Sequence, residues 1–261
     1  MGASMLKKLG IAAATAMLSC GLAQGADIAR PVYKAAPVVA TMYDWSGFYV
    51  GINGGWGKAD YDHAFNSAGH YNFVAGDSFN YSKSGGVLGG HLGYNWQAGQ
   101  WVFGIEGAMM KTWLDSGAQT SPFFPATDTF QSKIDWIATA TGRVGYAWNN
   151  VLGYVKGGWA YTSFNDFVQD TNDFVDADGK KSGWTLGGGV EFALSPNWIF
   201  GVEYNYYDFG SINVNQASTN FSGGTFTPGT DHNLDLTVQT VLGRLTYKFG
   251  GYGKGPVTAR Y

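Results

Sequence analysis

The stretch Thr237-Val-Gln-Thr-Val-Leu-Gly-Arg-Leu-Thr-Tyr-Lys-Phe249 decides the fold, because its residues alternate between two kinds of face. One face, counted back from the end, carries Phe249, Tyr247, Leu245, Gly243 and Val241. The other carries Lys248, Thr246 and Arg244, with Leu242 as its one apolar member. A period of two residues predicts a β-strand. An apolar face ending in aromatics, opposite a polar face, predicts a wall that faces lipid around a polar interior.

The composition of the chain agrees with short alternating strands. Its 261 residues include 40 Gly, 10 Trp, 16 Tyr and 17 Phe, with 13% charged residues and a formal net charge of −3. The mean hydropathy is −0.13, and no segment after the N-terminal region offers the roughly 20 consecutive apolar residues of a membrane-spanning helix. The weak net charge argues against nucleic-acid binding, which needs a concentrated Lys/Arg surface.

The same alternation recurs in seven other segments, at 45–56, 87–96, 101–109, 134–148, 151–161, 184–194 and 198–209. In the segment 134–148, Ile134 and Trp136 are expected on the apolar face, opposite Asp135 and Arg143. Aromatics at the strand ends are expected to form two interfacial girdles; these are Trp45, Trp56, Trp96, Trp101, Trp148, Trp184 and Trp198.

The connections between these segments alternate strictly between two lengths. Short turns are expected at 97–100, 149–150 and 195–197, and long polar loops near 58–83, 111–132, 162–182 and 211–233. A sandwich has no reason to sort its loops in this way. The sequence therefore predicts an all-β, eight-stranded antiparallel transmembrane β-barrel with short periplasmic turns and four long extracellular loops.

The N-terminus has the pattern of a secretory signal in residues 1–25. Lys7 and Lys8 precede a short apolar run, and Ala23-Gln-Gly25 provides small residues at the cleavage positions, so the mature chain is expected to begin at Ala26. Residues 26–43 are expected to be a periplasmic linker, 44–249 the barrel and 250–261 a C-terminal tail. Cys20 is the one cysteine, and a lipoprotein signal acylated there is the alternative.

Seven charged residues are expected on the polar faces of the strands, and hence in the lumen: Glu106, Arg143, Lys156, Glu191, Glu203, Arg244 and Lys248. An eight-stranded barrel is just wide enough for side chains to fill it. An internal ion-pair network that closes the lumen is therefore expected. The alternative is a path for protons or ions.

Several segments are similar to one known family. They are Asp44-Trp-Ser-Gly-Phe-Tyr-Val-Gly51, Gly86-Val-Leu-Gly-Gly-His-Leu-Gly-Tyr-Asn-Trp-Gln97, Val102-Phe-Gly-Ile-Glu-Gly107, Gly142-Arg-Val-Gly-Tyr-Ala-Trp148, Gly183-Trp-Thr-Leu-Gly-Gly-Gly-Val-Glu191, Asn197-Trp-Ile-Phe-Gly-Val-Glu-Tyr204 and Leu245-Thr-Tyr-Lys-Phe249. Together they resemble the outer-membrane immunogenic protein family of alphaproteobacteria, which are small eight-stranded "porin family" barrels.

This resemblance implies a cell outer-membrane location, reached by export and by the barrel-assembly machinery. Outer-membrane lipid and lipopolysaccharide are then the expected surroundings, and Ala26 is a candidate for attachment to peptidoglycan. The insertion signal is expected at Val241, Leu245, Tyr247 and Phe249, although the chain continues to Tyr261.

Catalytic, metal and cofactor sites are not predicted. His63, His70 and the pair Asp77-Ser78 share one expected loop, but a mobile loop does not fix a base beside a nucleophile, and no Gly-x-Ser-x-Gly motif occurs. The spacing of His63 and His70 matches no standard zinc pattern. A possible ligand site for haem in the first loop would use Tyr61, His63, His70 and Tyr71.

The sequence thus predicts a monomeric, non-enzymatic surface barrel that strengthens the envelope and presents loops to lipopolysaccharide, host or environment. The alternatives are a narrow porin for small solutes and haem or ligand capture by the first loop.

Overall fold

The structure, a computed structural model, describes residues 42–66, 75–115, 117–120, 129–169, 173–220 and 225–250. Within them lie nine strands: β1 (Gly47–Phe65), β2 (Ser78–Ala98), β3 (Trp101–Asp115), β4 (Gln119–Thr120), β5 (Thr129–Trp148), β6 (Val151–Gln169), β7 (Asp173–Ala193), β8 (Trp198–Asn220) and β9 (Thr225–Lys248). No helix in this part of the chain is long and apolar enough to cross a membrane.

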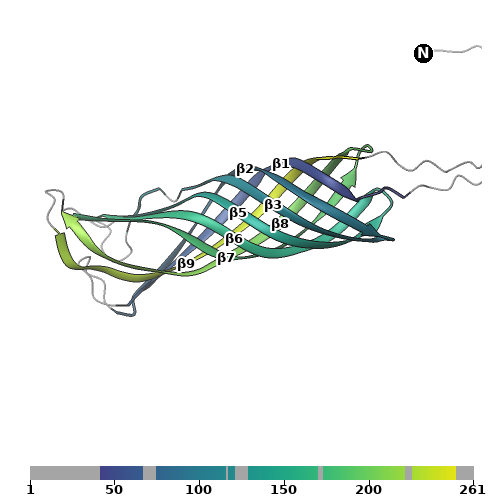
Figure 1. The fold of residues 1–261 in the computed structure, drawn as a ribbon. Coiled ribbons are helices and arrows are strands. Elements are labelled where there is room, and N and C mark those ends of the chain that lie inside the picture. Colours follow the sequence, from purple (N-terminus) through teal and green to yellow (C-terminus); the bar gives the residue numbers. More distant parts are fainter. Residues whose placement is uncertain are drawn as a thin grey trace, which may run out of the picture. The chain divides into compact units, whose positions relative to one another are not determined.

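The eight long strands close into a barrel. Neighbouring strands follow the order β3-β2-β1-β9-β8-β7-β6-β5, and an additional pairing of β3 with β5 joins the two ends of the sheet (Figure 1). Every pairing is antiparallel. β4 is a two-residue strand beside β5. The fold predicted from the sequence, an eight-stranded antiparallel barrel, is confirmed.

One rim of the barrel carries the tight turns, and it also holds both ends of the barrel sequence. β1 starts there and β9 ends there, joined by a hydrogen bond of 2.8 Å from the Phe249 amide to the Phe48 carbonyl (Figure 1). In the turn between β5 and β6, Asn149 has a φ of 54°, a left-handed conformation that Asn tolerates better than most residues. We call this rim the turn end and the opposite one the loop end.

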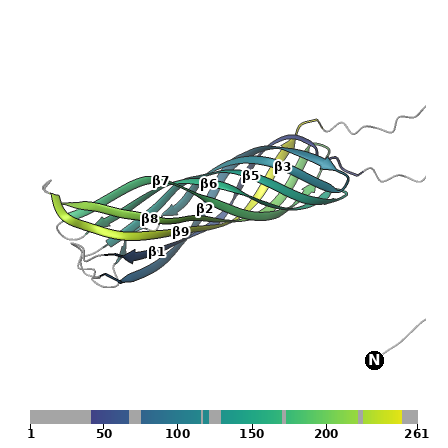
Figure 2. The same cartoon turned by 60° about the horizontal axis from the view of Figure 1, so that its bottom comes forward.

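The strands run further toward the loop end than the sequence indicated. Much of the ranges expected as long loops is strand, since β1 continues to Phe65 and β8 to Asn220. Beyond Trp56 the outward residues of β1 are Lys58, Asp60 and Asp62 while Ala59 and Tyr61 point inward, so the apolar face changes from the outside to the inside of the wall. The backbone ladder nevertheless continues, with Asp62 paired to both Asn80 and Asp235. Figure 2 shows β7, β8, β9 and β1 side by side along this part of the wall.

An apolar band surrounds the turn-end half of the barrel. Its exposed side chains include Phe48, Ile52, Trp56, Leu92, Trp96, Trp101, Ile105, Trp148, Trp159, Trp184, Leu186, Trp198, Phe200, Val202, Val241 and Phe249. Such an outward face suits lipid rather than water, because contiguous exposed apolar surface of this extent is rare on water-soluble proteins.

Two apolar residues, one aromatic and one aliphatic, do not lie on the faces that the sequence predicts for them. Trp45, expected in a girdle, is fully buried, because it precedes β1 and its indole packs inside the turn end against Val102 and Leu152. Ile134, expected beside Trp136 on the apolar face, is also fully buried. A register shift between Ile134 and Trp136 reverses the inward–outward order of β5 at this point.

Candidate functional sites in the barrel interior

The turn end of the lumen is filled by an apolar cluster. Its buried members are Trp45, Val102, Ala147, Leu152, Tyr154 and Ile199, with Tyr43 and Ala193 packed against them. The Trp45 amide donates a 2.7 Å hydrogen bond to Oε1 of Gln97, which belongs to the end of β2. The segment just before β1 is therefore folded into the turn-end mouth of the barrel, and we call this group the turn-end cluster.

A network of buried ion pairs lies next along the lumen, around Glu106 of β3. Lys156 Nζ is 3.1 Å from Glu106 Oε1 and 2.8 Å from Glu203 Oε1. Arg244 contacts both Glu106 and Glu203 through its two terminal nitrogens. Arg143 completes the network with a bidentate contact to Glu191, at 3.1 and 2.7 Å. Six strands thus meet in one network of three carboxylates and three cations.

Phenol rings complete the polar contacts of this network. Tyr49 donates a 3.0 Å hydrogen bond to Glu106 Oε2, and Tyr154 donates one of 2.5 Å to Glu203 Oε2. The Arg143 guanidinium lies 4.3 Å from the centre of the Tyr154 ring. Buried charges are tolerated where each finds opposite charge and hydrogen bonds, and these contacts provide both.

Lys248, the seventh residue expected in the network, lies apart from it. It occupies the last position of β9, at the turn end. Its ammonium donates to the Asp44 carbonyl and lies 4.6 Å from the centre of the Tyr43 ring. Because Lys248 lies beyond Arg244 toward the turn end of β9, its ammonium meets the segment before β1 instead of joining the ion pairs.

A larger apolar cluster fills the lumen on the other side of the ion pairs. Its buried members are Ala59, Tyr61, Val87, Met110, Leu114, Ile134, Ile137, Ala160, Tyr207, Phe209, Ile212, Leu234, Leu236, Val238 and Leu242. The lumen therefore holds three layers in series: the turn-end cluster, the ion pairs and this loop-end cluster.

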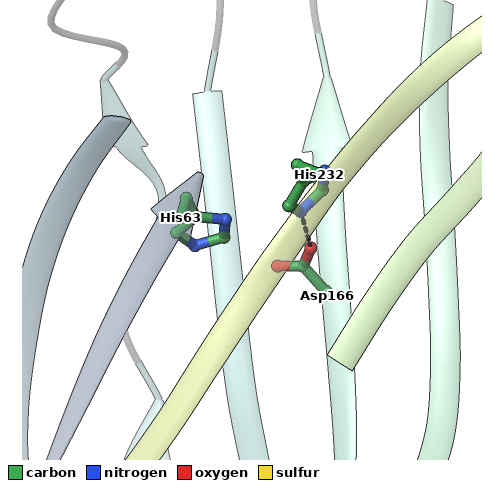
Figure 3. A group of neighbouring side chains, drawn as sticks. All are labelled: His63, Asp166 and His232. Atoms are coloured by element: carbon green, nitrogen blue, oxygen red, sulfur yellow. Dashed lines mark hydrogen bonds and ion pairs between the residues drawn. The ribbon is translucent and has the colours of Figure 1, made fainter. Parts of the chain in front are cut away.

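Beyond the apolar band, near the loop end, three remote residues converge. His63 of β1, Asp166 of β6 and His232 of β9 point toward one another (Figure 3), and their potential ligand atoms all lie within 4.8 Å of one another. All three side chains are buried, with exposures of 1%, 1% and 0%. We call them the histidine–aspartate cluster.

Hydrogen bonds link the histidine–aspartate cluster into a chain. His232 Nε2 is 3.3 Å from Asp166 Oδ2, and Ser132 donates a 2.6 Å hydrogen bond to Asp166 Oδ1. The Tyr81 hydroxyl is 2.6 Å from Ser132 Oγ and 3.3 Å from His63 Nε2. These contacts orient the carboxylate and both rings toward one another.

Burial governs the protonation of this cluster, which lies outside the membrane-spanning segments. Burial lowers the pKa of His63 to about 4; the charge of Asp166 opposes this change and His232 adds to it. Burial raises the pKa of Asp166, but the contacts with His232, His63 and Ser132 outweigh it, so this pKa lies below its ordinary value. At neutral pH the His63 ring is neutral and the Asp166 carboxyl is ionised.

Of the residues expected in a first-loop ligand site, the two that the structure describes are not presented to solvent. Tyr61 and His63 lie on β1 with exposures of 1% each, and Tyr61 donates a 3.2 Å hydrogen bond to the Leu114 carbonyl. His70 and Tyr71 lie outside the described residues. Ser78 pairs with Ala64 on the outward face of the wall, so it does not meet the inward His63 as a nucleophile would have to.

Sequence reasoning missed the histidine–aspartate cluster, although a signal for it exists. The alternation of the apolar band, counted onward along each strand, places His63, Asp166 and His232 at inward positions. These segments are polar enough on their outward side to be predicted as loops, and strand parity has no meaning in a loop.

Comparison with known proteins finds a matching family and relatives that are all outer-membrane proteins. The sequence matches the family described as outer membrane protein beta-barrel domain over residues 12–249. It is 30% identical over 229 residues to the 31 kDa outer-membrane immunogenic protein of Brucella melitensis biotype 1, covering 83% of this chain and 92% of that one. It is 31% identical over 180 residues to the 22 kDa outer membrane protein of Rhizobium leguminosarum bv. viciae, covering 69% and 72%.

Among solved structures, the outer membrane protein OprG of Pseudomonas aeruginosa is similar with a TM-score of 0.44 and 14% identity. The similarity covers 78% of this chain and 97% of that one.

Proposed function

Because the chain belongs to the outer membrane protein β-barrel family, we propose that it is a closed, non-enzymatic barrel with a structural role in the envelope and an interaction role at the cell surface. It is an outer-membrane protein, as its relatives are. The observation that carries the proposal is the filled lumen, in which two apolar clusters enclose the ion pairs of Glu106.

A filled lumen argues against the porin alternative. Open aqueous channels belong to barrels of about 16–18 strands, and this barrel has eight long strands. Its charged residues contact one another rather than lining a water-filled path, since Glu106, Arg143 and Arg244 are each 5% exposed or less. A solute would have to displace all three layers.

The surface role rests on the strands of the loop end. They extend past the apolar band, and most of their outward positions there are polar. A barrel built in this way holds lipopolysaccharide headgroups or external partners against a fixed β-surface. The relatives named as immunogenic outer-membrane proteins support exposure of this end to the outside.

The same proposal includes how the barrel is inserted into the outer membrane. Val241, Leu245 and Phe249 are exposed on the outward face of β9, with Tyr247 between them; we infer that the barrel-assembly machinery reads this face. Attachment of Ala26 to peptidoglycan would tie the monomeric barrel to the cell wall, and Ala26 lies outside the described residues.

Planar-bilayer conductance of the purified protein tests the closed lumen, with a heat-modifiable gel shift as the measure of folding. We expect no discrete openings from folded protein. Reproducible single-channel steps that scale with the folded fraction would refute the closed barrel and favour the porin alternative.

The envelope role is tested in cells. A strain lacking this protein should become more sensitive to detergent and EDTA, and the intact gene should restore resistance. Unchanged sensitivity, in a strain whose other barrels are present at normal levels, would contradict a structural role while leaving the conductance result untouched.

A further inference from the structure

We propose that His63, Asp166 and His232 bind a divalent transition-metal ion, of which Zn²⁺ is the prime candidate. The site lies inside the barrel near the loop end and beyond the apolar band (Figure 3). Neutral imidazole suits Zn²⁺, Co²⁺ and Ni²⁺, and two histidines with one carboxylate form a donor set common to such ions.

The geometry is close to that of a bound ion. In a tetrahedral zinc site, ligand atoms lie about 2.0–2.2 Å from the metal and so about 3.3 Å from one another. His232 Nε2 and Asp166 Oδ2 already stand 3.3 Å apart. The whole set lies within 4.8 Å, so His63 approaches by a small side-chain rotation to complete the three protein ligands.

The hydrogen-bond chain assigns the protons of the site. Ser132 donates to Asp166, so its oxygen accepts from the Tyr81 hydroxyl. The Tyr81 oxygen in turn accepts from His63 Nε2, which places the lone pair of this ring on Nδ1. Metal-binding histidines characteristically donate their second ring N–H to an oxygen, and Tyr81 fills this role.

Metal binding would also compensate the negative charge of the buried Asp166 carboxylate. Asp166 is a fully buried carboxylate, and a buried charge needs a compensating partner. A divalent ion supplies that charge, with His232 bound through Nε2 and its ring proton moved to Nδ1. Three protein ligands leave at least one position for water.

The aromatic surroundings exclude competing ligands. The Phe79 ring stacks on His63 with centroids 4.9 Å apart and an interplanar angle of 5°, and the Phe65 ring lies 5.2 Å from His232. These two phenyl rings pack against the imidazoles and limit the access of water, so the ion would be held by the three named side chains.

The consequence of binding is a cross-link through the barrel. Along the sheet order β1-β9-β8-β7-β6, β1 and β6 stand on opposite walls of the eight-stranded ring. One ion would therefore join opposite walls where no lipid supports them.

Titration of the purified, folded, metal-free barrel with Co²⁺ tests the site, because Co²⁺ gives visible d–d absorption when bound by nitrogen and oxygen ligands. Zn²⁺ should then displace Co²⁺ and raise the unfolding temperature in proportion to ln(1 + [Zn²⁺]/Kd). We expect one equivalent per barrel.

The informative variants are Asp166→Asn and His232→Gln, which should abolish the one-equivalent absorption and the thermal shift. Ser132→Ala should weaken binding by about 10- to 100-fold, as loss of a ligand's hydrogen-bond partner does. The matched controls are Asp62→Asn, a carboxylate on the outward face next to His63, and His91→Asn, a buried histidine bonded to Thr246. Both should bind as the unaltered protein does.

Every variant is first scored for the heat-modifiable folded form, so that misfolded protein is not counted. If Asp166→Asn and His232→Gln each fold and still bind one equivalent, the proposal is wrong. It is also wrong if the unaltered barrel shows no saturable absorption with Co²⁺ and no thermal shift with Zn²⁺.

Discussion

Glu106 is the residue on which the lumen's charge balance depends, because it contacts three cations at once. Its carboxylate reaches Lys156 at 3.1 Å, Arg143 at 3.6 Å and Arg244 through Nη2. The sequence identified Glu106 as inward from strand parity alone, since Ile105 and Phe103 mark the outward face. The cations that Glu106 contacts are set by the register between neighbouring strands. The residue pattern of one strand does not contain that information.

Glu106→Gln should destabilise the barrel by about 3–5 kcal/mol, because it leaves an uncompensated positive charge among buried groups. Urea unfolding in lipid vesicles, followed by tryptophan fluorescence, measures the loss. The control is Asp135→Asn, which removes a carboxylate paired to Lys111 and Lys133 on the exposed face and should cost less than about 1 kcal/mol. Equal effects of the two changes would show that burial of the network contributes nothing.

Gly55 tests how closely β1, the first strand, approaches β9, the last strand, with which it pairs. A Cβ at this position would lie 2.0 Å from the Val241 carbonyl oxygen, and a backbone atom in a paired strand cannot move away. Gly55→Ala should therefore cost about 1–3 kcal/mol in the same unfolding assay. Gly142→Ala is the matched change, since its Cβ would meet nothing within 4 Å, and it should be near neutral. A neutral Gly55→Ala would contradict the pairing of these strands.

At the scale of the strand, the sequence predicts the membrane-facing half well and the rest poorly. Lipid contact forces alternation from Phe48 to Trp56, so this half of β1 is visible in the sequence. Past Trp56 water lies outside the wall, so the outward residues are polar and the inward ones mainly apolar; the lipid-facing pattern is lost although pairing continues to Phe65. The histidine–aspartate cluster was missed for this reason.

Irregularities within a strand were also invisible. The register shift in β5 turns Ile134 inward, and nothing in the local residue types marks it. The sequence predicted the wrong place for Trp45 because an aromatic residue at a strand end suits both an outward interfacial girdle and an inward position that fills the mouth of the barrel. Only the three-dimensional path of the segment before β1 distinguishes them.

β9 carries the proposed insertion signal, and Phe249→Ala tests it. The change should lower the amount of folded protein in the outer membrane by weakening recognition during assembly, with unfolded chain accumulating in the periplasm. Cell fractionation and the heat-modifiable gel shift measure both. Phe200→Ala removes an outward aromatic of similar exposure from β8 (43% against 51%) and should leave assembly near normal; equal losses from both changes would argue that Phe249 acts only through lipid contact.

For the molecule as a whole, the three lumen layers act in series, so the loss of one should not open a path. Trp45→Gly removes the largest side chain of the turn-end cluster but leaves the ion pairs and the loop-end cluster in place. This variant should remain silent in planar bilayers, with the unaltered protein as the control. Discrete conductance from Trp45→Gly would mean that the turn-end cluster alone closes the barrel.

Because the strands continue past the apolar band, antibodies that bind this end of the protein would recognise residues on folded strands. Asp62, Asn80 and Asp235 are neighbours on one outward patch, yet they come from three strands, and Asp235 on the last strand is far from the other two in the sequence. Serum raised against whole cells would therefore contain antibodies to a discontinuous epitope that exists only in the closed barrel. Peptide arrays cut from the chain would fail to detect those antibodies, and a vaccine based on this region would have to deliver the folded protein.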